Sequence, residues 1–110
     1  MGRGSRAAPE PGRVTRLVFR PAAAGDVEDG FRWYEEQRQG LGGEFVEEVS
    51  RAVRAVQATP ERYPVVLRDT RRALLRRFPY GLFYRVYADH IVVVACMHAS
   101  RDPIRWRVPK

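Results

Sequence analysis

Three apolar segments in the second half of the chain are joined by connections too short to hold a helix. The segments cover residues 71–78, 82–87 and 91–97 and are rich in leucine, valine and aromatic residues, which favour β-strands. Parallel neighbours need a crossover of about a dozen residues, whereas antiparallel neighbours need only a turn. Residues 78–81 (FPYG) suit a type I turn and residues 88–90 (ADH) supply the next turn. The sequence therefore predicts antiparallel strands here.

Two amphipathic helical patterns precede these strands. Pro21 can open the first helix, in which apolar residues recur at helical spacing as far as Tyr34. A glycine-rich break at residues 40–43 separates it from a second apolar stripe over residues 45–56. Thr59 precedes a proline, which disfavours the helical region and ends this stripe. We expect two helices joined by a short turn.

The complete order of predicted elements is β-α-α-β-β-β, because an alternating segment at residues 14–20 reads as a strand before the helices. The segment at residues 91–97 lacks alternation, which predicts a strand in the sheet interior with both faces covered. Trp33 and Tyr34 are predicted to pack in the core. The fold class is α+β, with a helical hairpin packed as one layer on a mainly antiparallel sheet.

The length of 110 residues suits one compact domain. Residues 1–12 hold three glycines and two prolines without a periodic apolar pattern, which predicts a flexible tail. Residues 13–110 are then the single folded domain. Nothing in the sequence indicates the oligomeric state.

The sequence also predicts where the protein acts and which cofactors it lacks. Its longest apolar run has seven residues, whereas a membrane-spanning helix needs about 20. The first 13 residues have no apolar stretch typical of a signal peptide, so we expect a cytoplasmic protein. Cys96 is the only cysteine, so neither an intrachain disulfide nor a cysteine-based zinc cluster can form. No metal or organic cofactor is expected.

Positive charge is concentrated in the second half of the chain. The formal net charge is +7, and residues 1–57 carry nine arginines and nine acidic residues, so the whole excess lies after residue 57. Such a surface attracts polyanions such as nucleic acid, or an acidic protein, without selecting between them. Nearly all the basic residues are arginine, which fits either GC-rich coding or bidentate contacts to phosphate and carboxylate.

The densest basic group is Arg71, Arg72, Arg76 and Arg77. In one continuous strand, Arg72 and Arg76 share one face while Arg71 and Arg77 share the other. One of these pairs is expected to meet acidic residues of the helices, such as Glu44, Glu47 or Glu48. The group either binds a partner or nucleic acid or forms a solvated face.

Arg85 and His98 each have two interpretations. Arg85 either projects onto the open sheet face beside Phe83 and Tyr87, where an antagonist protein can pack, or forms a surface ion pair. His98 closes the apolar strand shortly before Arg101 and is either a structural residue or an acid–base group, since imidazole titrates near neutral pH.

Four segments carry a family resemblance, in the order FRWYEEQRQGLGGEF, TPERYPVV, RRALLRRFPYGLFYRV and HASRDPIRW. Together they resemble the RelE/ParE superfamily of bacterial toxins. The likeness covers about residues 14–107. It implies a small toxin of a type II toxin–antitoxin pair, neutralised by an antitoxin that wraps it. Such pairs are associated with plasmid maintenance and growth arrest.

The superfamily divides by target. RelE-like members cut messenger RNA on the ribosome, whereas ParE-like members poison DNA gyrase and are not known as nucleases. In many RNA-cleaving relatives an arginine stands near the start of the third sheet strand, and here that place falls on Gly81. Arg101 matches a basic position of those relatives, and Trp106 lies near an aromatic that stacks on a base. The segments WYEEQ, ERYP and HASRDPIRW are more similar to the ParE-like branch.

The leading hypothesis is therefore a non-enzymatic toxin that inhibits DNA gyrase. Its expected target-binding residues are Arg71, Arg72, Arg76, Arg77, Arg85, Arg101, Arg105 and Trp106. The alternative is a metal-independent endoribonuclease acting on ribosomes with messenger RNA, in which His98 and Arg101 are catalytic. A third alternative is a chain that has lost toxicity and only binds its antitoxin.

Overall fold

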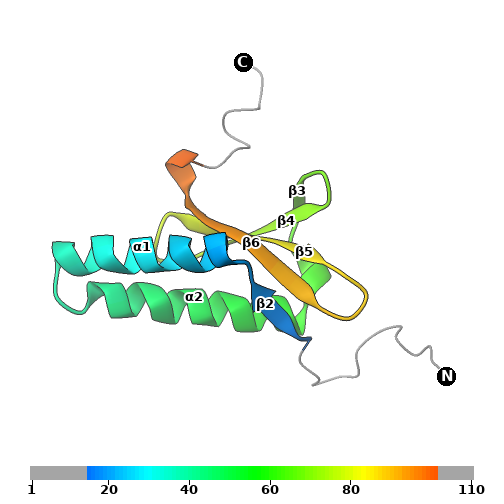
Figure 1. Cartoon of the computed structure of the whole chain (residues 1–110), viewed down its shortest axis with the longest axis horizontal. Coiled ribbons are helices and arrows are strands. Elements are labelled where there is room, and N and C mark those ends of the chain that lie inside the picture. The colour runs from blue at the N-terminus through cyan, green and yellow to red at the C-terminus, as the bar shows by residue number, and fades with distance from the viewer. Residues whose placement is uncertain (1–14, 102–110) are drawn as a thin grey trace, which may run out of the picture.

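The computed structural model describes residues 15–101 and places two helices against one five-stranded sheet (Figure 1). The predicted α+β order is confirmed, and the structure adds a short strand, β3, that the sequence did not predict. The predicted tail, residues 1–12, and the start of the first strand at Val14 lie outside the described range. The elements are β2 (Leu17–Phe19), α1 (Pro21–Gln37), α2 (Leu41–Ala58), η1 (Pro60–Arg62), β3 (Val65–Leu67), β4 (Thr70–Leu74), β5 (Tyr80–Val86), β6 (Ile91–His98) and η2 (Ala99–Arg101).

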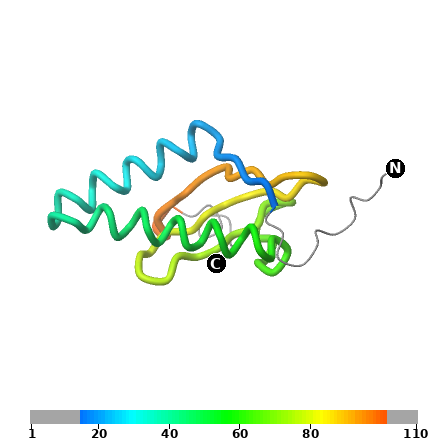
Figure 2. Tube along the Cα trace, turned by 90° about the horizontal axis from the view of Figure 1, so that it is seen from below, coloured from blue at the N-terminus to red at the C-terminus, as the bar shows by residue number. Residues whose placement is uncertain are grey.

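The two helices form an antiparallel hairpin that covers one face of the sheet (Figures 1 and 2). Gly40 lies in the turn between them with φ 90°, a conformation that glycine adopts without steric cost. The Glu35 carboxylate accepts hydrogen bonds of 2.9 Å from the backbone N–H groups of Gly40 and Gly42. The glycine-rich break therefore makes a tight turn that α1 itself stabilises. No helix within residues 15–101 is long and apolar enough to cross a membrane.

The sheet has the strand order β2-β6-β5-β4-β3, with β2 parallel to β6 and every other pair antiparallel. The interior position of β6, between β2 and β5, confirms one part of the prediction made from its apolar run. Ile91 and Val93 are buried, whereas Val92 and Val94 are only half-buried. The second face of β6 is therefore covered only in part.

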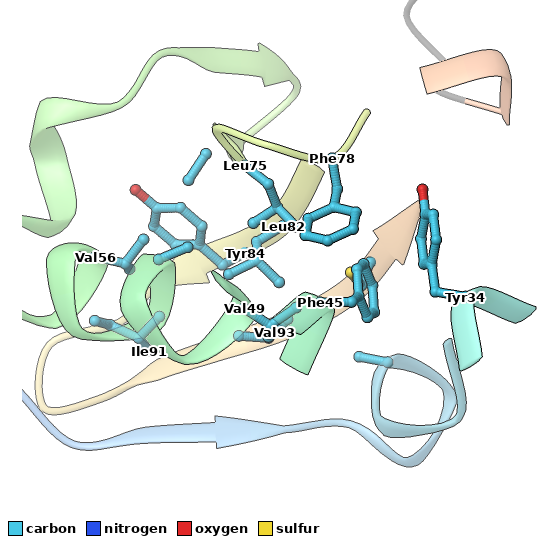
Figure 3. Packing of buried hydrophobic residues seen from close by; sticks show 14 residues of the cluster. Tyr34, Phe45, Val49, Val56, Leu75, Phe78, Leu82, Tyr84, Ile91 and Val93 are labelled. Carbon is cyan, nitrogen blue, oxygen red and sulfur yellow. The ribbon is translucent and has the colours of Figure 1, made fainter. Parts of the chain in front are cut away.

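The core lies between the helical hairpin and the sheet (Figure 3). Its fully buried side chains include Phe45 from α2, Leu82 and Tyr84 from β5, and Val93 from β6. Tyr34 is buried as predicted, but the prediction that Trp33 packs in the core is wrong, since 55% of its surface is exposed. Adjacent residues on a helix point about 100° apart, so a stripe that buries Tyr34 turns Trp33 outward.

The connection between β4 and β5 differs from the prediction. The expected strand over residues 71–78 ends at Leu74, and the expected type I turn is wrong because Gly81 already pairs with Leu74 in the ladder. Leu75 N–H donates to Tyr80 O at 2.9 Å, and Tyr80 N–H donates to Phe78 O at 2.8 Å. Pro79 between them has no N–H to give to a ladder. Residues 75–79 therefore form a loop, which we call the arginine loop.

Candidate functional site

The arginine loop carries Arg76 and Arg77 away from the sheet. The expectation that Arg72 shares a face with Arg76, and Arg71 with Arg77, is therefore wrong. Arg77 Nη2 lies 2.8 Å from Glu44 Oε1 on α2, which confirms the expected contact with a helix acid. Its guanidinium lies 5.6 Å from the centre of the Phe78 ring. Arg76 is exposed, as is 62% of the Arg77 side chain, so both charges remain accessible.

Glu48, one of the helix acids expected near the arginine group, lies beneath this loop, although its burial was not predicted. It is only 7% exposed and forms an ion pair with Arg51 on the same helix. Burial raises the pKa of its carboxyl, but hydrogen bonding and charge from Arg51, together with hydrogen bonds from the backbones of Arg77 and Arg76, lower that pKa below its ordinary value. A buried carboxylate therefore fastens the loop backbone to α2.

This arrangement predicts an acid-sensitive contribution to stability. A carboxyl whose folded pKa is depressed stabilises the protein above its unfolded pKa, about 4.5, and loses this effect as the pH falls through the folded value. We expect Glu48→Gln to lower the free energy of unfolding at pH 7, and the difference from the parent protein to shrink below about pH 4.5. Urea denaturation from pH 7 to pH 3 measures this, with the exposed Glu47→Gln as control. A pH-independent difference would contradict the role of the charge.

Three other predicted residues lie away from the loop. Arg71 Nη1 donates to the backbone oxygens of Tyr63 at 2.6 Å and Glu61 at 3.1 Å, so it holds the segment before β3. Arg72 is opposite Phe83 in the ladder. Arg85 Nε donates to Thr70 Oγ1 at 3.2 Å and lies 3.4 Å from Asp69 Oδ1.

The interpretation of Arg85 as a surface ion pair is therefore confirmed. The expected open surface beside Phe83 and Tyr87 is only partly present, because Phe83 is 3% exposed whereas Tyr87 is 42% exposed. Phe83 is buried, but it does not belong to the core cluster that the helices cover. It lies opposite Arg72 in the ladder between β4 and β5.

His98 and Arg101 line a cleft of about 590 Å³ between α1 and the end of β6, which we call the α1–β6 cleft. His98 Nδ1 accepts a hydrogen bond of 3.0 Å from Ser100 N–H, and its ring meets the Tyr80 ring edge-on at 5.2 Å between centres. Arg105 and Trp106 lie outside the described range. The cleft is lined by Asp26, Asp29, Trp33, Tyr34, Pro79, Tyr80, Cys96, Met97, His98, Ser100 and Arg101.

The arginine loop and the α1–β6 cleft lie at the same end of the sheet. Tyr80 pairs with His98 in the ladder between β5 and β6. Ala99 N–H donates to Pro79 O at 2.7 Å, which ties η2 to the loop. The structure thus brings Arg76, Arg77, His98 and Arg101 to one end of the sheet. Arg71 and Arg85 lie in the opposite part of the sheet.

The cleft also contains residues that sequence reasoning assigned to the core or left out. Tyr34 is predicted to pack in the core and Tyr80 to lie in a turn, and in the structure their ring centres come within 6.0 Å of each other. Asp26 Oδ2 accepts a hydrogen bond of 3.0 Å from Cys96 N–H and so covers the edge of β6 beyond the short β2. Within the part of the chain that the structure describes, no group of three or more His, Cys, Asp or Glu side chains could hold a metal ion.

Comparison with known proteins decides the family. A family model described as the ParE toxin of the type II toxin–antitoxin system, parDE, matches residues 17–103. The chain belongs to the ParE toxin family. This match confirms the predicted resemblance and its closer similarity to the ParE-like branch of the superfamily. A ParE toxin of a type II system has a cognate antitoxin as its partner, so the expected antitoxin is supported as well.

A solved structure supports the same fold. It is titled "Chromosomal ParDE TA system from P. aeruginosa" and superposes with a TM-score of 0.70 at 18% sequence identity. The match covers 77% of this chain and 96% of that chain, which shows the ParE-like fold. No curated protein matches the sequence.

Proposed function

We propose that this ParE-family toxin arrests growth by binding DNA gyrase, and that the arginine loop is its main contact. The observation that carries the proposal is a pair of accessible arginines, Arg76 and Arg77, on a loop whose backbone is fixed at both sides. A fixed loop loses little conformational entropy on binding, and accessible positive charge accelerates encounter with an acidic partner or with DNA.

The position of Gly81 also supports a toxin that does not cleave RNA. In many RNA-cleaving relatives this place carries an arginine, and glycine can neither transfer a proton nor stabilise charge. A Cβ added at Gly81 would lie 3.2 Å from Arg72 Cγ, tighter than most Cβ contacts, and 3.4 Å from Leu74 Cδ2. A side chain at this position would therefore require the Arg72 side chain to shift by a few tenths of an ångström.

The test is a side-by-side assay on the purified full chain, alone and saturated with its antitoxin. We expect the free toxin to inhibit DNA supercoiling by gyrase, or to trap cleaved DNA on it, while messenger RNA on translating ribosomes stays intact. Addition of antitoxin should restore supercoiling. Normal supercoiling together with cleaved messenger RNA would overturn the proposal, and so would the absence of any effect on growth.

The second candidate is the endoribonuclease. It is favoured by one observation, the meeting of His98, Arg101 and two tyrosines in the α1–β6 cleft. In the ribosome assay, cleavage that is lost in His98→Ala would support this candidate.

The wider role follows from the first candidate. DNA gyrase is a cytoplasmic enzyme. A toxin that inhibits it must act in the cytoplasm, so we place this protein there. Loss of the antitoxin would then release the toxin and arrest growth, and a plasmid that encodes both proteins would be stabilised in this way.

A further inference from the structure

The face of the sheet opposite the two α-helices differs from the helices in its chemistry. None of the five described strands contains Asp or Glu, whereas α1 and α2 each carry several. Side chains on this face alternate along each strand with those that point into the helix-covered core, such as Ala73 and Leu82. We call it the open sheet face and define it by Arg72, Leu74, Gly81, Phe83 and Met97.

Leu74 is the exposed apolar centre of the open sheet face. At 58% it is the most exposed of the large apolar side chains in the described range. Gly81 pairs with Leu74 on one side and with Met97 on the other. A Cβ at Gly81 would lie 3.4 Å from Leu74 Cδ2, so the leucine side chain leans over the glycine. The ladder and this contact hold an apolar side chain at the surface in a defined place, where a partner can cover it.

Positive charge surrounds Leu74. Arg72 precedes it on the same face, and the aliphatic stem of Arg72 also lies over Gly81, with Cγ 3.2 Å from the Cβ position. Arg76 follows Leu74 by two residues and is exposed on the arginine loop. An apolar centre with a charged rim is the usual anatomy of a protein interface. Because the strands offer no carboxylate, the complementary partner surface is acidic.

We propose that the open sheet face extends the gyrase contact beyond the arginine loop, and that Leu74 inserts against an apolar segment of the gyrase protein flanked by carboxylates. The inference rests on the proposed function. Two observations support it: the arginine loop begins at the residue after Leu74, so the two surfaces are continuous, and the charge is one-sided. The partner is protein and not the DNA on gyrase, since interfaces with DNA are more polar and more charged than a surface centred on a leucine.

Photocrosslinking identifies what covers Leu74. The full-length toxin carries the benzophenone amino acid p-benzoylphenylalanine in place of Leu74 and is irradiated with gyrase and DNA. We expect a covalent adduct with a gyrase subunit, and mass spectrometry should place it beside Asp or Glu residues. Val65 is the matched control position, because it is 49% exposed but pairs with Arg71, one residue out of step with Arg72, and so lies on the other face. The probe at Val65 should give little adduct.

Substitutions at Leu74 test the apolar contact and the charge of the partner separately. We expect Leu74→Ser to raise the toxin concentration for half-inhibition of supercoiling about tenfold, whereas Val65→Ser should change it less than about threefold. Leu74→Lys and Leu74→Glu remove the same apolar group and add opposite charges. Against an acidic partner, the glutamate variant should be weaker than the lysine variant by about tenfold or more at low salt. A thermal melt of each variant confirms that it is folded.

Failure of this inference differs from failure of the proposed function. If the parent toxin does not inhibit gyrase, the proposed function falls and this inference falls with it. If the parent inhibits gyrase but Leu74→Ser matches Val65→Ser, the inference alone is wrong. It is also overturned if the lysine and glutamate variants are equal, if the probe at Leu74 captures DNA and not a gyrase subunit, or if the two probe positions give equal adducts.

Discussion

We expect the replacement of Arg76 and Arg77 with glutamate to abolish growth arrest and to weaken gyrase inhibition at least tenfold, equivalent to about 1.4 kcal/mol or more. Reversing two accessible charges turns attraction toward an acidic surface or DNA into repulsion. The change removes the ion pair between Arg77 and Glu44 and sets like charges beside each other. We expect the fold to tolerate this, because the ion pair is largely exposed and the loop backbone is also held by Glu48 and by the hydrogen bond between Ala99 and Pro79. Growth on induction and the supercoiling assay measure the effect.

A matched control separates local contact from overall charge. Arg16 and Arg20 are exposed before α1, and their double change to glutamate alters the net charge equally. We expect this control to remain toxic, and the Arg76→Gln and Arg77→Gln double variant to be intermediate. Binding to the antitoxin and a thermal melt verify the fold of each variant. Equal loss of toxicity in the control would show that net charge, not the arginine loop, is responsible.

Replacing Phe45 with alanine lowers the free energy of unfolding by about 3–5 kcal/mol. The side chain is fully buried, and its ring centre lies 5.3 Å from Tyr34, 5.4 Å from Phe78 and 4.9 Å from Tyr80. The loss combines the transfer energy of the ring with the cavity left behind. Since domains of this size are stable by about 5–15 kcal/mol, the variant loses a large part of its stability. Urea denaturation measures the difference.

Phe31→Ala is the corresponding control on the hairpin. Phe31 is 39% exposed on α1, so the same chemical change is expected to cost about 1 kcal/mol or less. Equal losses in the two variants would contradict the placement of Phe45 at the centre of the core. Because Phe45 contacts Phe78 of the arginine loop, Phe45→Ala is also expected to reduce toxicity at temperatures where the domain remains folded.

The helices and the order of strands could be predicted because local patterns determine them. Pro21, the glycine-rich break and the Thr59-Pro60 step mark the helix ends directly. The end of β4 could not be predicted in the same way. Residues 75–78 have the composition of a strand, but Phe78 leaves the ladder to pack on Tyr34 and Phe45, and only the tertiary structure reveals that contact.

The candidate site was predicted in its residue types but not in its grouping. Adjacent arginines suggested one basic cluster, yet strand geometry and the loop send Arg71, Arg72 and Arg77 to different surroundings. Glu48 was expected as one of several helix acids near the arginines, but its burial could not be predicted, because a glutamate on an amphipathic helix is normally exposed and this burial depends on a loop distant in sequence. Tyr34 and Tyr80 meet only through packing of α1 on the sheet.

The parallel pairing of β2 with β6 determines when the domain can form during protein synthesis. Strand β6, which lies between β2 and β5, is the last described strand to leave the ribosome, and both of its neighbours are made before it. Until Ile91–His98 has emerged, β2 has no strand to pair with and β5 lacks a partner on one side. Contacts between distant segments form slowly, so nascent chains stay open until translation is nearly finished. A prematurely terminated chain lacking β6 is therefore expected to be inert, and an antitoxin already present has time to capture the toxin as it folds.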